Sequence, residues 1–339
     1  MAKDRTIVTL LLLAPFIAEL LSGATRLSVI YVLIPEVMTW GCGALIIREL
    51  VRRWQGARVS LLLLAPTLAI AEEIIIQQTS LAPLVFAGSN PTYGRAFGVN
   101  WIWLLAMLVF ESFAVVLLPL QLTELAFRDR RNAPWLRARG FIIAGAVFLL
   151  GAFLAWFAWT QNYCIKILHL APYHPPVLYI AAGLAAILLL GLASYGSRGV
   201  ALSPDRATSK PAPPLIVGIV AALVVYPWQF VIALNFNLLP HLPFWIALLV
   251  GVAYTGTVFL ILRRLSAAAG WSDLHRFAVC GGATVAVMVW GVTTLWHGRR
   301  LDQLGEAIFI AVGFAFLADL GRGLLARGKS QQAEQKTYA

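Results

Sequence analysis

The stretch APTLAIAEEIIIQQTSLAP, residues 65–83, is an apolar run with two adjacent glutamates, Glu72 and Glu73, near its centre. The whole chain has the same apolar character. It has 339 residues, of which 60% are hydrophobic and 12% charged, and its mean hydropathy is +0.81. A soluble core cannot absorb this much apolar surface. Apolar runs of about 20 residues recur along the chain, each long enough to cross a bilayer as a helix. The sequence therefore predicts an all-α, polytopic integral membrane protein.

These runs predict ten transmembrane spans. Both termini are predicted to be cytoplasmic, because basic loops stay on the cytoplasmic side of a membrane. With that orientation, the only basic residues outside are Arg26, Arg95, Lys166, Arg299 and Arg300, among 26 Lys and Arg in the chain. The third and fourth runs are long, so we expect a tilt or a kink in them. The spans cover approximately residues 6–25, 28–49, 59–86, 100–127, 140–161, 177–195, 214–236, 243–262, 276–296 and 305–326.

The charge and the cysteines of the chain exclude other classes of protein. The net charge of +11 is spread over the predicted inner loops, so topology and the anionic lipid of the cell membrane account for it. We expect lipid and not nucleic acid as a partner. Cys42, Cys164 and Cys280 are scattered and show no CxxC spacing, a pattern that supports neither a disulfide nor a thiolate metal site. The chain has no zinc-protease, P-loop or dinucleotide-binding signature, so we expect no metal and no cofactor.

A polar linker divides the predicted membrane region. In residues 196–213, Ser, Pro, Asp, Lys and Arg replace the apolar pattern, which marks a cytoplasmic loop. The linker separates an N-terminal part of six helices, residues 1–195, from a C-terminal part of four helices, residues 214–327. The tail, residues 328–339, is polar and is predicted to be disordered.

Acidic residues within the predicted spans are concentrated in the N-terminal part. Each costs about 2.5–3.5 kcal/mol at the centre of a membrane helix. Spans five to nine contain none, so we expect the function to lie in the first four spans. The seven acids that lie within the spans, away from their extreme ends, are Glu19, Glu36, Glu72, Glu73, Glu111, Glu124 and Asp319.

Four of these glutamates are predicted to lie at similar depths. Counted from the outer ends of their spans, Glu19, Glu36 and Glu111 are about 6 to 11 residues deep, and Glu73 is about 13. They can therefore share one region in the middle and outer part of the membrane. Carboxylates so close together in a low dielectric cannot all be ionised. Such a group suits general acid–base catalysis, proton relay or cation binding, although protonated glutamates also serve as structural hydrogen bonds between helices.

The third span is predicted to separate the two adjacent glutamates. Glu73, Gln77 and Ser80 are spaced i, i+4 and i+7, so on one helix they form a polar stripe. Glu72 points about 100° away from that stripe. One glutamate of the pair can then face a functional site while the other faces a neighbouring helix.

The outer loop FAGSNPTYGRAFGVNWIW, residues 86–103, joins the helices that carry Glu72, Glu73 and Glu111. Its Asn-Pro and Tyr-Gly pairs are typical of turns, and its tryptophans are typical of the membrane interface. The loop is either a short hairpin connector or a lid over the acids, with Arg95 as the counter-ion of a carboxylate. Connection lengths favour the connector.

The stretch AEEIIIQQTSL, residues 71–81, resembles the first motif of the CPBP intramembrane proteases, a family of CAAX-prenyl endopeptidases and bacteriocin-processing or immunity proteins. In that motif a Glu pair is followed by three apolar residues, Arg and Gly. The resemblance implies that Glu72 and Glu73 are a catalytic pair, in which a glutamate activates a water. Gln77 stands at the position of the Arg and Gln78 at the position of the Gly.

The two other motifs of that family differ in this chain. The second motif is a Phe and a His four residues apart in the next helix, and in LVFESFAVV, residues 108–116, the polar residue is Glu111. The third motif, a His followed four residues later by Asn, has no counterpart. The resemblance covers about residues 59–127 and implies a relative with altered or lost catalysis.

Three functions remain open. The first is a hydrolase-like protein acting on a membrane-embedded peptide, with Glu72 or Glu73 polarising water and Glu111 in the place of the family's histidine. The second is a proton- or cation-coupled carrier of a small molecule, in which Glu19, Glu36, Gln77 and Ser80 line the binding site. The third is a structural membrane subunit.

Overall fold

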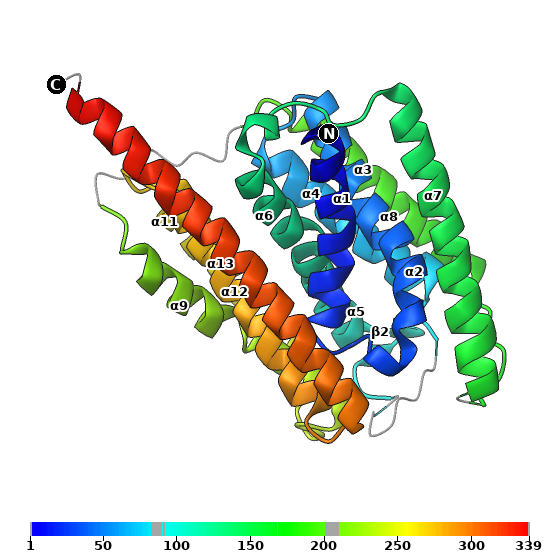
Figure 1. Ribbon diagram of the computed structural model, residues 1–339. Coiled ribbons are helices and arrows are strands. Elements are labelled where there is room, and N and C mark those ends of the chain that lie inside the picture. The colour runs from blue at the N-terminus through cyan, green and yellow to red at the C-terminus, as the bar shows by residue number, and fades with distance from the viewer. Residues whose placement is uncertain (1, 83–89, 91, 168, 201–209, 338–339) are drawn as a thin grey trace.

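The computed structural model describes residues 2–82, 90, 92–167, 169–200 and 210–337 (Figure 1). Within these residues, nine helices are long and apolar enough to cross a membrane. The prediction of an all-α, multi-pass membrane protein is therefore confirmed. The α-helices are α1 (Ala2–Pro15), α2 (Leu33–Glu36), α3 (Cys42–Arg53), α4 (Arg58–Ile70), α5 (Trp101–Glu111), α6 (Leu118–Ala126), α7 (Ala138–Trp156), α8 (Val177–Gly196), α9 (Pro214–Val225), α10 (Trp228–Ala233), α11 (Phe244–Leu265), α12 (Asp273–Leu295) and α13 (Arg300–Thr337).

Several spans are extended or interrupted by turns of other helix types. Wide π-helical turns continue or precede the α-helices at Phe16–Leu20, Val37–Gly41, Ala71–Ile76, Ser112–Leu117 and Phe157–Ile167. Short 3₁₀-helices occur at Leu27–Val32, Arg128–Arg130 and Leu234–Phe236. The third and fourth predicted spans, for which a tilt or a kink is expected, thus contain π-helical segments, which are a known cause of helix distortion.

The nine candidate spans differ from the predicted ones mainly at their ends. They are Leu27–Arg53, Arg58–Ile76, Trp101–Ala126, Ala138–Lys166, Val177–Gly196, Pro214–Phe236, Phe244–Leu265, Asp273–Leu295 and Arg300–Gly328. The first predicted span corresponds to α1 and its continuation Phe16–Leu20, which is not among the nine. The third helix ends at Ile76 and not near residue 86, because Gln78 adopts a left-handed backbone conformation with φ of 59°. Residues 83–86 of that predicted span lie outside the described residues.

The last helix, α13, runs from Arg300 to Thr337. The disorder predicted for the tail, residues 328–339, stays a prediction. Figure 1 shows α13 as one long helix whose last turns lie at the same end of the molecule as the start of α1.

The spans divide into inner and outer helices. In the spans that contain α3, α4, α5 with α6, and α12, 50–56% of the most apolar window is buried inside the protein. For the other five spans the buried share is only 11–28%, so these helices present most of their surface outward. The spans that carry Glu36, Glu72, Glu73 and Glu111 belong to the inner group.

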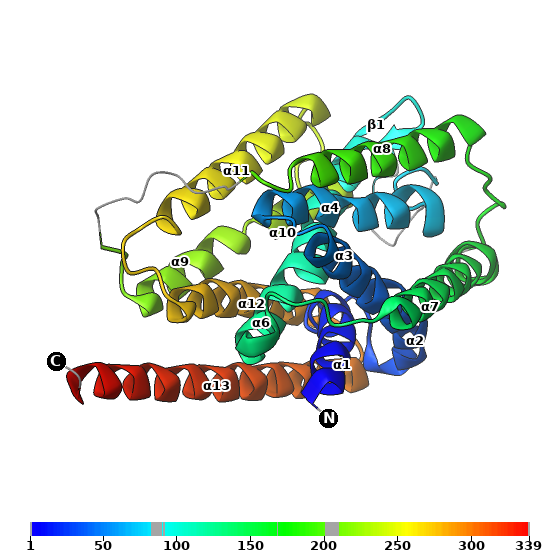
Figure 2. The same ribbon diagram turned by 90° about the horizontal axis from the view of Figure 1, so that it is seen from above.

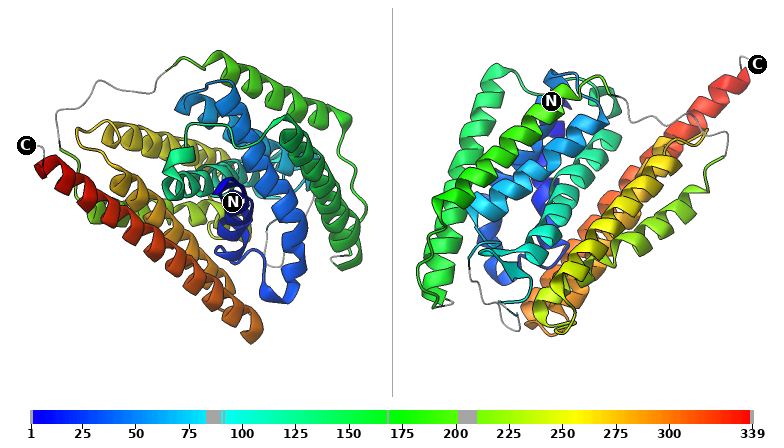
Figure 3. Two further views of the ribbon diagram at one scale, coloured as in Figure 1. Left: turned by 45° about the horizontal axis from the view of Figure 1, so that its top comes forward. Right: turned by 180° about the vertical axis from the view of Figure 1, so that it is seen from behind.

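The helices after residue 214 form a layer beside α1–α8 (Figure 2, Figure 3). α12 is the inner member of this layer, since it packs between α9 and α13 and also contacts α6. The backbones of α9 and α12 touch, because a Cβ on Gly282 would lie 2.0 Å from the carbonyl oxygen of Gly218. α10 and α11 contact α5. The acid-bearing helices are thus packed between the C-terminal layer on one side and α7 and α8 on the other.

Candidate functional site

Five carboxyl groups gather inside the N-terminal part, and we call them the carboxylate cluster. Each one faces at least one other carboxyl group closely enough for direct electrostatic repulsion. Four of the side chains expose only 2–6% of their surface, and Glu19 is half-buried. The cluster consists of Glu19, Glu36, Glu72, Glu73 and Glu111. The structure therefore brings together the glutamates that the depth count places in one region.

Every member of the carboxylate cluster lies in a π-helical segment or directly before one. Glu19 is in Phe16–Leu20, and Glu72 and Glu73 are in Ala71–Ile76. Glu36 immediately precedes Val37–Gly41, and Glu111 immediately precedes Ser112–Leu117. Single π-helical turns inside α-helices occur frequently at functional sites, because the wider turn redirects side chains. The coincidence in four separate segments marks the cluster as the candidate site.

Glu73 is held by hydroxyl groups from the turn that ends its helix. The left-handed backbone at Gln78 folds the chain back, and Thr79 Oγ1 and Ser80 Oγ each donate to Glu73 Oε2 over 2.5 Å. Trp103 Nε1 donates in turn to Thr79 Oγ1 over 3.2 Å. Ser80 thus reaches Glu73 through this turn and not along a helical stripe, because the helix has already ended at Ile76.

Glu72 has a different environment from that of its neighbour. Its side chain is 2% exposed, yet neither of its carboxyl oxygens accepts a well-formed hydrogen bond from the residues that the structure describes. The side chains of Gln77 and Trp40 lie beside it. A buried carboxyl without partners is costly, so Glu72 is the member of the cluster with most capacity to take up a ligand.

Thr25 connects the two other carboxyl groups. Its Oγ1 lies 2.5 Å from Glu19 Oε2 and 3.1 Å from Glu36 Oε1. A hydroxyl group has only one hydrogen to donate. For both contacts to be hydrogen bonds, one of the two carboxyl groups must carry a proton and donate it to Thr25.

The carboxyl groups of Glu73 and Glu111 lie within interaction distance of each other. An ionised carboxylate is an acceptor only, so a hydrogen bond between these two groups would require a proton on one of them. Two carboxyl groups that share one proton form the acid pair known from aspartic proteases. The second oxygen of Glu111, Oε2, has no hydrogen-bond partner among the described residues and stays available to a ligand.

The carboxylate cluster lies apart from the ion pairs of the described residues. The ion pairs formed within the described residues lie elsewhere, at the ends of α3, α6 and α12. In the same part of the chain, no set of three or more His, Cys, Asp or Glu side chains is arranged to hold a metal ion. The functional groups of the candidate site are therefore carboxyl and hydroxyl groups.

Arg95 holds the loop next to the cluster. It lies at the start of the hairpin formed by β1 (Arg95–Ala96) and β2 (Val99–Asn100). Its guanidinium donates to the carbonyl oxygens of Leu81, Ala82 and Gly98 over 2.8, 2.8 and 3.0 Å. Burial lowers the pKa of Arg95, and the nearby Tyr173 opposes that shift. These contacts fix the chain that carries Thr79 and Ser80, and a role for Arg95 as counter-ion of a carboxylate stays a prediction.

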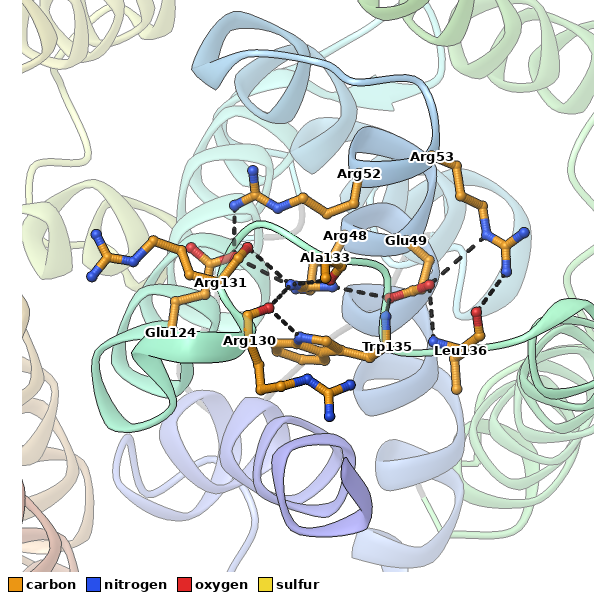
Figure 4. Close-up of polar contacts among 10 residues, drawn as sticks. All are labelled: Arg48, Glu49, Arg52, Arg53, Glu124, Arg130, Arg131, Ala133, Trp135 and Leu136. Atoms are coloured by element: carbon orange, nitrogen blue, oxygen red, sulfur yellow. Dashed lines mark hydrogen bonds and ion pairs between the residues drawn. The ribbon is translucent and has the colours of Figure 1, made fainter. Parts of the chain in front are cut away.

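A second group of buried charges lies where α3 meets the loop between α6 and α7, and we call it the arginine network (Figure 4). Arg48 is 1% exposed, and its guanidinium lies 3.4 Å from the centre of the Trp135 ring. It pairs with Glu49 at 3.0 Å and with Glu124 at 3.5 Å, and Arg52 donates to Glu124 over 2.7 Å. Glu124 is therefore neutralised by arginines and does not belong to the carboxylate cluster.

The arginine network also binds backbone groups of the α6–α7 loop. Glu49 accepts from the backbone N–H groups of Trp135 and Leu136 over 2.6 and 3.1 Å. Arg48 Nη2 lies 3.1 Å from each of three carbonyl oxygens, those of Arg130, Arg131 and Ala133. The sequence patterns described above do not indicate this network. A sequence feature that could have indicated it is the Arg-Glu pair at positions 48 and 49, at the end of a predicted span.

Two further buried acids, Asp302 and Glu306 on α13, are also missed by the sequence analysis. They expose 1% and 3% of their surface. The predicted tenth span begins at residue 305, so both acids fall at its boundary, where charged residues are ordinary. Asp319, which is in the predicted span, is exposed on the outer face of α13. The spacing i, i+4 of the two acids was the available signal, since it places them on one helix face.

The fold and the cluster together define a multi-pass helical membrane protein with buried glutamates. Comparison of the chain with protein-family models, curated proteins and solved structures gives no match.

Proposed function

We propose that the carboxylate cluster binds and releases protons inside the membrane. The Thr25 bridge from Glu19 to Glu36 carries this proposal, because full hydrogen bonds from one hydroxyl group to both carboxyl groups require a proton on one of them. The proximity of Glu73 and Glu111 supports it. Intramembrane carboxyl groups that face one another are typical of proton relays in pumps and transporters. The unpartnered oxygens of Glu72 provide a further place for a proton or cation at the centre of the cluster.

The first function that we propose is a carrier that couples proton or cation movement to a small molecule. The carboxyl groups come from four helical segments that are each interrupted by a π-helical turn. Binding sites of secondary transporters are formed by interrupted helices near the middle of the membrane. Helices that are already distorted at the acids can change the exposure of the site without unfolding.

This function is tested with the purified protein in lipid vesicles that enclose a pH-sensitive dye. Pools of small metabolites are added outside, and a solute-dependent change of internal pH is expected. Glu73→Gln should abolish the signal, because it removes the acid pair, whereas Asp319→Asn, an exposed acid on α13, should keep it. A signal that Glu73→Gln leaves intact would contradict the assignment of the cluster.

The second candidate function is an intramembrane hydrolase. It is favoured by the contact of Glu111 with Glu73, because the resemblance to CPBP proteases implies a functional side chain from the next helix at that place. A carboxyl pair sharing a proton can activate water without a histidine. The test is cleavage of single-span membrane peptides, with Glu73→Gln and Glu111→Gln both expected to be inactive although correctly inserted. Equal cleavage by the two variants and the natural protein would exclude this function.

The third function, a structural membrane subunit, has its own signature. If single Gln substitutions at Glu36, Glu72, Glu73 and Glu111 change only the thermal stability, the carboxyl groups serve as hydrogen bonds between helices. Neither solute-dependent proton movement nor peptide cleavage would then be observed in any variant.

We also propose ten crossings of the cell membrane with both termini in the cytoplasm. The additional crossing is α1 with Phe16–Leu20, whose inward-facing residues are fully buried. The retention of basic loops inside supports the orientation. Labelling of cysteines introduced at Gly199 and Arg26 tests it: a membrane-impermeant reagent applied to whole cells should label only position 26.

A further inference from the structure

Glu306 lies where the C-terminal layer meets the segment that follows α1. At this junction α13 packs closely on the chain, because Cβ atoms on Gly305 and Gly313 would lie 2.5 Å from Leu27 and 2.4 Å from Met288. The first turns of α13 pack on the 3₁₀-helix Leu27–Val32, which follows α1 in the chain. Glu306 therefore occupies a tightly packed contact between the two parts of the protein.

The carboxyl group of Glu306 has no partner and faces a backbone carbonyl. The side chain is 3% exposed, and neither oxygen has a hydrogen bond among the described residues. Glu306 Oε1 lies 2.0 Å, and the carbonyl oxygen of Leu21 2.6 Å, from the position that a Cβ on Gly291 would take. The missing side chain of Gly291 thus leaves room for both oxygen atoms in the same small space. An ionised carboxylate there would lie near the negative end of the carbonyl dipole.

The charged groups nearby compensate Asp302 and not Glu306. Asp302 Oδ1 accepts from the backbone N–H of Ser28 over 2.9 Å, and Arg26 and Arg299 interact with it electrostatically. Of the two acids on this face of α13, Asp302 therefore has donors and positive charges, whereas Glu306 has a carbonyl group. On the facing segment, the acid nearest in sequence to Leu21 is Glu19.

We propose that Glu306 is a second proton-binding site, at which the protonated carboxyl group donates a hydrogen bond to the carbonyl oxygen of Leu21. The carboxylate takes up one proton from water and no other bond changes. A proton needs only one donor and one acceptor, and the two oxygens beside Gly291 supply them. A Ca²⁺ ion would need six to eight oxygen ligands.

Protonation of Glu306 is linked to the turn that carries Glu19. The N–H of Leu21 donates to the carbonyl oxygen of Phe16 over 2.9 Å, and the N–H of Thr25 donates to that of Glu19 over 3.1 Å. A hydrogen bond to Leu21 therefore stabilises the backbone that places Glu19 and Thr25. The Glu306 site does not depend on the function proposed for the carboxylate cluster. Only an effect of Glu306 on proton movement through the cluster rests on that proposed function.

The site is tested by infrared spectroscopy of the full-length protein in lipid bilayers during a pH titration. Glu306→Gln should lose the band of one protonated carboxyl group, and the matched control Asp319→Asn should keep it. A spectrum of Glu306→Gln that equals that of the natural protein at every pH would overturn the proposal. If Glu306→Gln does not insert, Glu306→Asp replaces it, and a shifted band is then expected because the shorter acid cannot reach Leu21.

A second measurement follows the junction itself. Hydrogen exchange of residues 21–25, corrected for the intrinsic effect of pH, should accelerate at least threefold in the natural protein once Glu306 loses its proton. In Glu306→Gln the amide still donates to Leu21, so the exchange should no longer depend on pH. Equal pH dependence in both proteins would contradict the linkage. A loss of the proton signal in vesicles that occurs only in Glu73→Gln would concern the carboxylate cluster. It would leave the proposal for the Glu306 site unaffected.

Discussion

In the arginine network each carboxylate faces a guanidinium, whereas in the carboxylate cluster the carboxyl groups face one another. Arg48, Glu49 and Glu124 are as deeply buried as Glu72 and Glu73, so the two groups differ in compensation and not in burial. The network ties a loop to α3 by ion pairs and backbone hydrogen bonds. The cluster leaves carboxyl oxygens without partners. The comparison teaches that burial of charge alone does not indicate function, while burial without compensation does.

The largest expected effect is the loss of the central cation of the arginine network. Arg48→Met keeps the volume of the side chain but leaves Glu49 and Glu124 buried with fewer positive partners. Breaking a buried ion pair from one side costs about 3–5 kcal/mol. Thermal unfolding of the purified protein should show a strongly lowered midpoint. A midpoint within a degree of the natural protein would mean that the network is not a stabilising unit.

The same substitution type should have opposite effects in the two regions. Glu124→Gln removes a charge that pairs with Arg48 and Arg52, and hydrogen bonds to charged groups contribute about 1.5–3 kcal/mol. Glu72→Gln replaces a buried carboxyl group that has no ion pair and no well-formed hydrogen bond among the described residues, so its unfolding midpoint should be unchanged or higher. The two variants are compared by thermal unfolding at one pH. Similar destabilisation by both would remove the distinction between the regions.

Thr25→Val tests the hydroxyl group between two carboxyl groups. The substitution keeps the shape of the side chain and removes the contacts with Glu19 and Glu36. We expect a loss of about 1 kcal/mol, smaller than the effects in the arginine network. Thermal unfolding measures this loss. In the Glu19→Gln variant, Thr25→Val should cost less stability than it does in the natural protein. Strict additivity of the two losses would show that Thr25 and Glu19 do not interact.

The smallest effect is expected at the edge of the arginine network. Arg53 is 33% exposed and lies 3.8 Å from Glu49, so Arg53→Met should cost no more than about 1 kcal/mol. It is the matched control for Arg48→Met, because the side chain type and the helix are the same. A cost equal to that of Arg48→Met would show that exposure does not weaken this ion pair.

The sequence was sufficient for those features that depend on local composition. Apolar runs predict the spans, because the length of a run and the thickness of a bilayer are directly comparable. Counting depth along the spans places Glu19, Glu36, Glu73 and Glu111 in one region, and the structure brings them together. The roles assigned to these residues stay predictions.

The features that sequence reasoning missed depend on the backbone. The end of the third helix depends on the left-handed conformation of Gln78, which hydropathy does not register. The arginine network depends on carbonyl and N–H groups of residues 130–136, more than 80 positions away from Arg48. The Glu306 site depends on a missing side chain at Gly291. In each case the deciding partner is a main-chain atom, which no side-chain pattern represents.

The π-helical segments have a consequence for comparing this chain with others. An α-helix turns by about 100° per residue, and a π-helical turn holds one residue more than an α-helical one. The segments around the acids are therefore places where a related chain can be one residue shorter and keep its fold. An alignment of such spans by hydropathy alone would shift every residue beyond Glu73 or Glu111, and a motif that extends past the acids would then be read at the wrong positions.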